Sequence, residues 1–166
     1  MKTVYLIGFM GSGKSTIAAM IRKETGCKLV EMDARIVEEQ GMSINDIFAK
    51  YGESHFRDLE SDLVRRIGEE GNAIVSCGGG VVVRPENVKT MKATGMIVFL
   101  KASPETIYER VRYSTDRPIL NGHMNVEYIA QLMEKRRALY EAAADAIVCV
   151  DGKTKTQVKE EILALL

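Results

Sequence analysis

The glycine-rich segment Gly8–Thr16, GFMGSGKST, constrains the fold of this chain more than any other feature. A glycine, four further residues and then Gly13-Lys14-Ser15 form the spacing typical of loops that wrap phosphate groups. The apolar run Val4–Gly8 precedes the segment, and apolar residues with helical spacing follow it. Glycines let backbone N–H groups approach a phosphate, and the N-terminus of a helix adds partial positive charge. The segment therefore predicts a strand, a phosphate-binding loop and a helix that bind a nucleoside triphosphate; the alternative is a chance glycine-rich turn.

The loop also contains the residue types that phosphoryl transfer needs. We expect the ammonium of Lys14 to bridge the terminal phosphates and the hydroxyl of Ser15 to hold Mg²⁺. The residues of the loop expected to contact ATP are Gly11, Ser12, Gly13, Lys14, Ser15 and Thr16. A phosphate loop alone does not identify the molecule that accepts the phosphoryl group, so the acceptor has to be inferred from the rest of the chain.

The remaining chain alternates between apolar runs and segments with helical spacing. The runs are continuous rather than alternating, which indicates parallel strands covered on both faces. They are Val4–Gly8, Lys28–Met32, Ala73–Cys77, Met96–Leu100 and Ala146–Val150. Helix caps are expected at Ser43, at Ser103 before Pro104, and at Thr154, where Gln157 completes a capping box. This alternation predicts an α/β fold of three layers in a single domain spanning residues 1–166, with right-handed crossovers.

Composition excludes several other classes of protein. The 23 basic and 23 acidic residues give a net charge of zero, which argues against a nucleic-acid binder or a protein held on an anionic membrane. No apolar run approaches the roughly 20 residues of a membrane span, and the N-terminal sequence lacks a signal-peptide layout. Three widely spaced cysteines, Cys27, Cys77 and Cys149, argue against a disulfide framework or a zinc site. We expect a cytoplasmic protein with buried or half-buried thiols.

Two segments that follow strands are candidates for the acceptor site. Glu31 and Asp33 lie two residues apart at the end of the second run, and such residues share a face of a strand. One carboxylate is then available to a metal and the other to a substrate hydroxyl; the alternative is that Asp33 caps the next helix. Three glycines, Gly78–Gly80, follow the third run and let a ligand touch backbone N–H groups. The alternative is a tight turn that needs a positive φ.

Three arginines occupy informative positions. Arg136 falls on the apolar stripe of segment 126–143, seven residues after Ile129, so it points inward and needs an anion. Arg57 lies at the start of a helix, three residues before Glu60. It is a candidate for binding a ligand anion, and the alternative is an internal ion pair with Glu60. Arg117 lies in the polar stretch 113–125, where a mobile loop with one arginine is what a phosphoryl-transfer lid requires; the alternative is a solvated loop charge.

Together these motifs resemble the shikimate kinase family, in order and over essentially the whole chain. Only the phosphate loop is a specific motif by itself, whereas all the motifs taken together are highly specific for the family. The matching motifs are Gly8–Thr16, Glu31-x-Asp33, Phe48, Gly52-Glu53-x-x-Phe56-Arg57-x-x-Glu60, Gly78-Gly79-Gly80, Arg117-Pro118-Ile119-Leu120 and Arg136-x-x-Leu139-Tyr140.

The resemblance implies a P-loop NTPase fold with a five-stranded parallel sheet, a substrate-binding insertion at about 33–62 and a mobile lid at about 112–124. It implies transfer of the γ-phosphoryl group of ATP to the 3-hydroxyl of shikimate, a step of aromatic amino acid (chorismate) biosynthesis. The implied partner is this small-molecule substrate alone, bound by a monomer.

The resemblance also assigns roles residue by residue. Asp33 binds ring hydroxyls and is the proposed base, Arg57 and Arg136 hold the carboxylate, and Gly79 contacts the substrate through its backbone. Arg117 reaches the phosphates from the lid, and Arg110 and Lys153 flank the adenine. The family usually has aspartate where this chain has Glu31, which assists Mg²⁺ there.

Two other functions remain open at this point. One is a different small-molecule kinase of the same fold, acting on gluconate or a nucleotide. The other is a nucleotide-binding module without activity, which leaves Asp33, the three glycines and an inward Arg136 unexplained.

Overall fold

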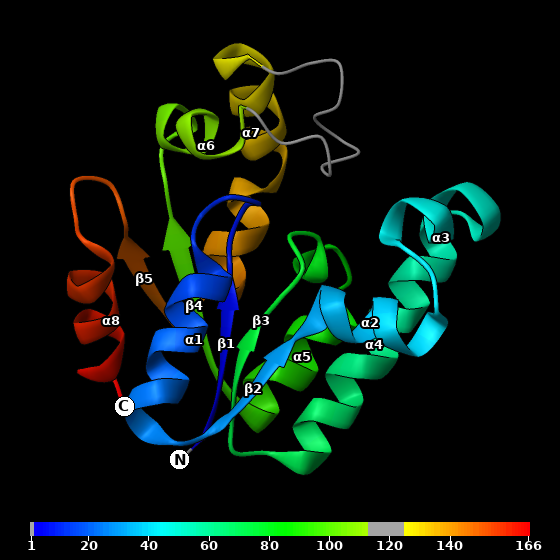
Figure 1. The fold of residues 1–166 in the computed structure, drawn as a ribbon, viewed down its shortest axis with the longest axis horizontal. Helices are drawn as coiled ribbons and strands as arrows, with labels where there is room; N and C mark the ends of the chain where they lie inside the picture. The colour runs from blue at the N-terminus through cyan, green and yellow to red at the C-terminus, as the bar shows by residue number, and fades with distance from the viewer. Residues whose placement is uncertain (1, 113–124) are drawn as a thin grey trace.

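A five-stranded, fully parallel sheet forms the centre of the molecule in the computed structural model, which describes residues 2–112 and 125–166 (Figure 1). The strand order is β2-β3-β1-β4-β5. The strands are β1 (Thr3–Ile7), β2 (Lys28–Glu31), β3 (Ala73–Ser76), β4 (Gly95–Lys101) and β5 (Ala146–Cys149). Each predicted run forms a strand whose ends lie within one residue of the prediction. The predicted α/β class is therefore confirmed.

Helices cover both faces of this sheet. They are α1 (Lys14–Thr25), α2 (Met32–Gln40), α3 (Ile44–Tyr51), α4 (Glu53–Glu70), α5 (Pro85–Thr94), α6 (Pro104–Val111), α7 (Val126–Ala143) and α8 (Lys155–Leu163), with a short 3₁₀ turn η1 (Val81–Val83). One apolar core lies between the sheet and α1, α6 and α8, and a second lies between the sheet and α4, α5 and the end of α7. Figure 1 shows α1 and α8 on one side of the strands, and α4 and α5 on the other.

Strand β1 lies in the centre of the sheet and is buried on both faces, which explains why its apolar residues do not alternate with polar ones. Val4 and Leu6 face the core on the α1 side, whereas Tyr5 and Ile7 face the core on the α4 side. All four side chains have no exposed surface. A parallel strand buried on both faces has no solvent-facing positions, so Val4–Ile7 are apolar without alternation.

The predicted helix caps are present. The side chains of Ser43 and Ser103 accept hydrogen bonds from the backbone N–H groups three residues later. Thr154 and Gln157 form the reciprocal capping box at the start of α8. These local interactions need only neighbouring residues, which is why the sequence predicts them correctly.

Three expectations about burial were wrong. Cys149 is exposed, because it lies on the edge strand β5. Leu165 lies on the apolar stripe that the sequence predicts with Val158 and Ile162, but it is exposed because α8 ends at Leu163. Leu139 was expected on the apolar stripe of segment 126–143, but it is 41% exposed. It lies ten residues after Ile129, and at 100° per residue this offset turns it about 80° away from the buried stripe.

Helix α5 was not predicted from the sequence, and a helix directly after β2, the present α2, was foreseen only in the alternative that Asp33 caps the next helix. Among the described residues, no helix is long and apolar enough to cross a membrane.

Candidate active site

The carboxyl ends of the parallel strands meet at one edge of the sheet, where a cavity of about 720 Å³ opens. The phosphate loop, the start of α1, and the segments after β2 and β3 line it. Its walls bring together Lys14, Ser15, Glu31, Asp33 and Gly79, which are separated widely in the sequence. Ligands of open parallel sheets bind at this edge, so the cavity is the candidate active site.

The phosphate loop has the backbone shape that its glycines predict. Gly11 and Gly13 have φ values of 80° and 99°, in the left-handed region that other residues avoid. Among the described residues, no side chain caps the N-terminus of α1, which leaves its first N–H groups available to an anion. The buried ammonium of Lys14 donates hydrogen bonds to the carbonyl oxygens of Gly8, at 2.7 Å, and Phe9, at 3.0 Å. A positive charge therefore lies within the loop.

The two predicted metal ligands touch each other. The hydroxyl of Ser15 donates to Oε2 of Glu31 at 2.8 Å and lies 3.2 Å from the hydroxyl of Ser76. Mg²⁺ prefers oxygen ligands and takes few of them from a protein when phosphates and water supply the rest. Among residues 2–112 and 125–166, no group of three or more His, Cys, Asp or Glu side chains is placed to hold a metal by itself. The hydroxyl and carboxylate pair fits Mg²⁺ bound together with a nucleotide.

The prediction that Glu31 and Asp33 share a face of one strand was wrong. Strand β2 ends at Glu31, and Asp33 belongs to the first turn of α2. The alternative that Asp33 caps this helix was also wrong, because Glu31 occupies the N-cap position. Both carboxylates nevertheless line the same cavity, because the chain turns into the helix at the carboxyl end of β2.

Close packing requires glycine at two of the three consecutive positions, Gly78 and Gly80, and backbone strain requires it at none. None of them has a φ in the left-handed region, so the tight-turn alternative does not apply. A Cβ on Gly78 would lie 2.8 Å from Oδ1 of Asp33 and 2.9 Å from Oε2 of Glu60. A Cβ on Gly80 would overlap the guanidinium of Arg57. The glycines thus form a floor, Gly78–Gly80, on which charged side chains from α2 and α4 pack.

Arg57 has the internal partner that its spacing suggests. Its Nη1 donates to Oε1 of Glu60 at 3.0 Å, and its Nη2 lies 3.3 Å from Glu53. Glu60 has no exposed surface; burial raises the pKa of its carboxyl, and the Arg57 charge opposes that rise. Nε of Arg57 and Oε2 of Glu60 are buried without a hydrogen-bond partner in the described part of the chain. The pair therefore keeps hydrogen-bonding capacity beyond what the protein uses.

The side chain of Arg136 reaches the glycine floor from α7. Its Nη1 lies 3.4 Å from the position that a Cβ on Gly79 would occupy. One turn later, the hydroxyl of Tyr140 donates a hydrogen bond to the carbonyl oxygen of Gly79. Burial raises the pKa of Tyr140, and the Arg136 charge opposes that rise. The predicted inward direction of Arg136 is confirmed, whereas the contact of Tyr140 with Gly79 was not predicted.

Basic residues surround the outer end of the phosphate loop. Nη1 of Arg110 donates to the carbonyl oxygen of Gly11 at 3.0 Å. Lys153 lines a small hollow with Arg110 and forms an ion pair with Glu161 at 2.7 Å. Lys155 lines both this hollow and the main cavity and was missed, although its place directly after the Thr154 cap puts it at the start of α8. Arg117 and the predicted lid at about 112–124 lie outside the described residues, apart from Arg112.

The fold and the cavity define a class of protein. A phosphate loop between β1 and α1, with carboxylates and arginines at the same edge of a parallel sheet, is the architecture of a P-loop phosphotransferase. In this class the loop holds the donor nucleotide, and the remaining cavity holds the acceptor.

Comparison with known proteins identifies the family. Residues 10–166 match the sequence profile of shikimate kinase. The shikimate kinase of Thermodesulfovibrio yellowstonii is 40% identical over 163 residues, which cover 98% of this chain and 94% of that protein. A structure of shikimate kinase from Acinetobacter baumannii in complex with shikimate has a TM-score of 0.94 at 25% identity and covers 99% of this chain and 92% of that one. The chain belongs to the shikimate kinase family, whose members use ATP to phosphorylate a hydroxyl group.

More distant structures share only the fold. A gluconokinase from Sinorhizobium meliloti has a TM-score of 0.61 at 20% identity and covers 98% of this chain and 90% of that one.

Proposed function

We propose that this protein transfers the γ-phosphoryl group of ATP to the 3-hydroxyl of shikimate, giving shikimate 3-phosphate and ADP. The observation that carries the proposal is the glycine floor, Gly78–Gly80, beside the phosphate loop, with Asp33, Arg57 and Arg136 packed against it. This arrangement offers two guanidinium groups and a carboxylate to one small molecule, which suits an acceptor with a carboxylate and hydroxyl groups.

On the acceptor side, Arg57 and Arg136 would hold the substrate carboxylate from two directions, and the backbone of Gly79 would contact the ring. Asp33 would orient the attacking hydroxyl and accept its proton. Glu60 would set the position of Arg57 through their 3.0 Å ion pair. Holding the acceptor hydroxyl next to the phosphate loop supplies much of the catalysis, because phosphoryl transfer depends on positioning and charge neutralisation.

On the donor side, the loop N–H groups and Lys14 would hold the phosphates, and Arg110 and Lys153 would flank the adenine. Ser15 and Glu31 would hold Mg²⁺, which neutralises phosphate charge when it is bound. Arg117 keeps the role that the family resemblance implies, contact with the transferred group. In these roles Lys14 and Arg117 stabilise the charge that develops as the phosphoryl group moves.

The test measures ADP release from ATP with shikimate, gluconate and AMP as separate acceptors. We expect turnover with shikimate that requires Mg²⁺, and rates at the background level with the other two. Lys14→Ala is the negative control, and it should fold yet lose at least about a hundredfold in kcat because a positioned cation is removed. Faster turnover with gluconate or AMP would assign the other kinase function, and ATP hydrolysis that does not depend on any acceptor would refute the proposal.

A further inference from the structure

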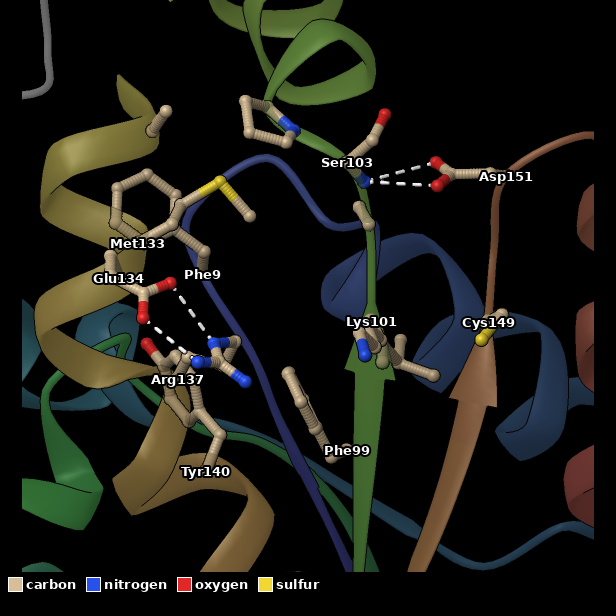
Figure 2. A pocket seen from close by; sticks show the side chains of 14 residues that line it. Phe9, Phe99, Lys101, Ser103, Met133, Glu134, Arg137, Tyr140, Cys149 and Asp151 are labelled. Atoms are coloured by element: carbon tan, nitrogen blue, oxygen red, sulfur yellow. Dashed lines mark hydrogen bonds and ion pairs between the residues drawn. The ribbon is translucent and has the colours of Figure 1, made fainter. Parts of the chain in front are cut away.

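A second cavity, of about 340 Å³, lies between α7 and the carboxyl ends of β4 and β5 (Figure 2). No described residue lines both this cavity and the candidate active site. Cys149, on the edge strand β5, lines the second cavity and is exposed, so the cavity reaches the surface beside this strand. Its volume falls within the range of small-molecule sites, at the lower end, which is enough for one ring with a short chain.

The walls of this cavity are apolar and partly aromatic. The rings of Phe99 and Tyr140 stack with centroids 5.0 Å apart and planes at 27°. Phe9, Pro104 and Met133 complete the walls. Figure 2 shows Phe9, Met133, Phe99 and Tyr140 arranged around the hollow. Flat rings pack well against such walls, because offset stacking and sulfur–ring contacts are both available.

The charged groups at the rim favour an anion. Both oxygens of Glu134 are bound by Arg137, at 2.8 and 3.0 Å. The carboxylate of Asp151 accepts hydrogen bonds from the N–H of Ser103 and the hydroxyl of Thr106. The acidic groups are therefore satisfied within the protein.

The ammonium of Lys101 at the same rim is less well satisfied than these acidic groups. In the described part of the chain its ammonium has one ion-pair partner, Glu141, at 3.7 Å, which is longer than a hydrogen bond. The same oxygen of Glu141 lies 3.6 Å from Arg137. Lys101 therefore retains hydrogen-bonding capacity at the mouth of an apolar cavity.

We infer that this cavity binds a small aromatic carboxylate, with the ring between Phe9, Met133 and the Phe99–Tyr140 pair and the carboxylate at Lys101. An occupant would contact Tyr140, whose hydroxyl holds the carbonyl of Gly79 in the acceptor site. Binding is thereby linked to the acceptor site through one side chain, a link that rests on the proposed function.

Cys149 makes a direct test possible. It lines the cavity and is exposed, whereas Cys27 and Cys77, the other cysteines of the chain, are buried. The rate at which iodoacetamide alkylates Cys149, followed by intact mass, therefore reports on the cavity without depending on activity. The probe is 3-phenylpropanoate, and the matched neutral compound is 3-phenylpropanol.

We expect 3-phenylpropanoate to slow alkylation about tenfold at ten times its dissociation constant, as mass action requires if the bound probe shields the thiol. The alcohol should protect less at the same concentration. Lys101→Met keeps the aliphatic stem and should abolish the difference between the two compounds. Lys23→Met, on the opposite face of the sheet in α1, is the control and should keep it. Equal alkylation rates with and without the acid would overturn the site, and equal protection by both compounds in the unmodified protein would overturn the anionic ligand.

The link to the acceptor site has its own measurement. 3-Phenylpropanoate at its dissociation constant for the unmodified protein should shift the KM for shikimate in the unmodified protein and in Lys23→Met, and in Lys101→Met the shift should fall to the one that the alcohol gives. A protected Cys149 together with an unchanged KM would refute the link through Tyr140. A protein that phosphorylates none of the acceptors would instead refute the proposed function, leaving the Cys149 result intact.

Discussion

Replacing Gly80 with alanine tests whether the glycine floor exists to make room for Arg57. A Cβ at this position would overlap the Arg57 guanidinium, whereas the backbone of Gly80, with a φ of −101°, accepts alanine without strain. Because the side chain of Arg57 is only 9% exposed and is bound to Glu60, its guanidinium cannot move aside without breaking that ion pair. The substitution should therefore act through Glu60, which would be left buried and unpaired.

The expected loss of stability can be worked out from the broken ion pair between Arg57 and Glu60. Breaking a buried ion pair by removing one partner costs about 3–5 kcal/mol. Replacing glycine by alanine at a compatible φ stabilises by about 0.4–1 kcal/mol through the unfolded state. The net expectation for Gly80→Ala at pH 7.5 is a loss of about 2–4.6 kcal/mol in the free energy of unfolding, together with a raised KM for shikimate because Arg57 is displaced.

The loss of stability in Gly80→Ala should depend on pH through the ionisation of Glu60. Burial already holds the pKa of Glu60 above its usual value, and losing Arg57 removes the opposing influence. A carboxyl whose pKa is higher in the folded state than in the unfolded state favours folding at acid pH, and this contribution disappears as the pH rises through the folded pKa. The deficit of Gly80→Ala should therefore be smaller at pH 5 than at pH 7.5.

Urea unfolding followed by circular dichroism at both pH values measures this difference, provided that the slope with urea is unchanged. Gly79→Ala is the matched control, because its Cβ would approach Arg136 no closer than 3.4 Å, an ordinary contact. Adding Glu60→Gln to Gly80→Ala should recover part of the loss at pH 7.5, since the buried charge is gone. A Gly80→Ala protein within about 0.5 kcal/mol of the unmodified chain at both pH values would refute the reasoning, because that is the range of an inert substitution.

Three further outcomes follow from other contacts. Glu31→Gln should shift the Mg²⁺ dependence of turnover more than the KM for shikimate, whereas Glu31→Asp should be tolerated; an unchanged Mg²⁺ titration would mean that Glu31 does not act on the metal. Arg136→Ala should weaken shikimate binding at least about thirtyfold, the lower end for a lost buried charge partner, with nucleotide binding nearly intact and Arg136→Lys rescuing only part; an equal loss for the neutral amide of shikimate would make its role purely structural. Burial raises the pKa of Asp151, but hydrogen bonds from Thr106 and Ser103 lower it more, so the pKa lies below its usual value. Asp151→Asn should therefore destabilise the protein at neutral pH. Thermal melts should show that this loss of stability shrinks as the pH falls below about 4.

Local patterns in the sequence determined the strands, the helix caps and the phosphate loop. The strand runs are apolar because both faces of a parallel sheet are buried, and the caps at Ser43, Ser103 and Thr154 depend on residues three positions apart. The phosphate loop, Gly8–Thr16, needs only its own glycines, its lysine and the helix that follows. Each of these features depends on short-range spacing, which a sequence displays directly.

Only the tertiary structure decided how the proposed acceptor site is built. The spacing of Glu31 and Asp33 suggested one strand face, but the chain enters α2 at Met32, and the two carboxylates line the same cavity because of that turn. The three glycines suggested a ligand surface, and the structure adds that a Cβ on Gly78 or Gly80 would collide with side chains of α2 and α4, whereas a Cβ on Gly79 would make an ordinary contact with Arg136 of α7. The contact of Tyr140 with Gly79 joins residues 61 positions apart. No local pattern encodes such a contact, because it depends on how α7 packs across the ends of the strands.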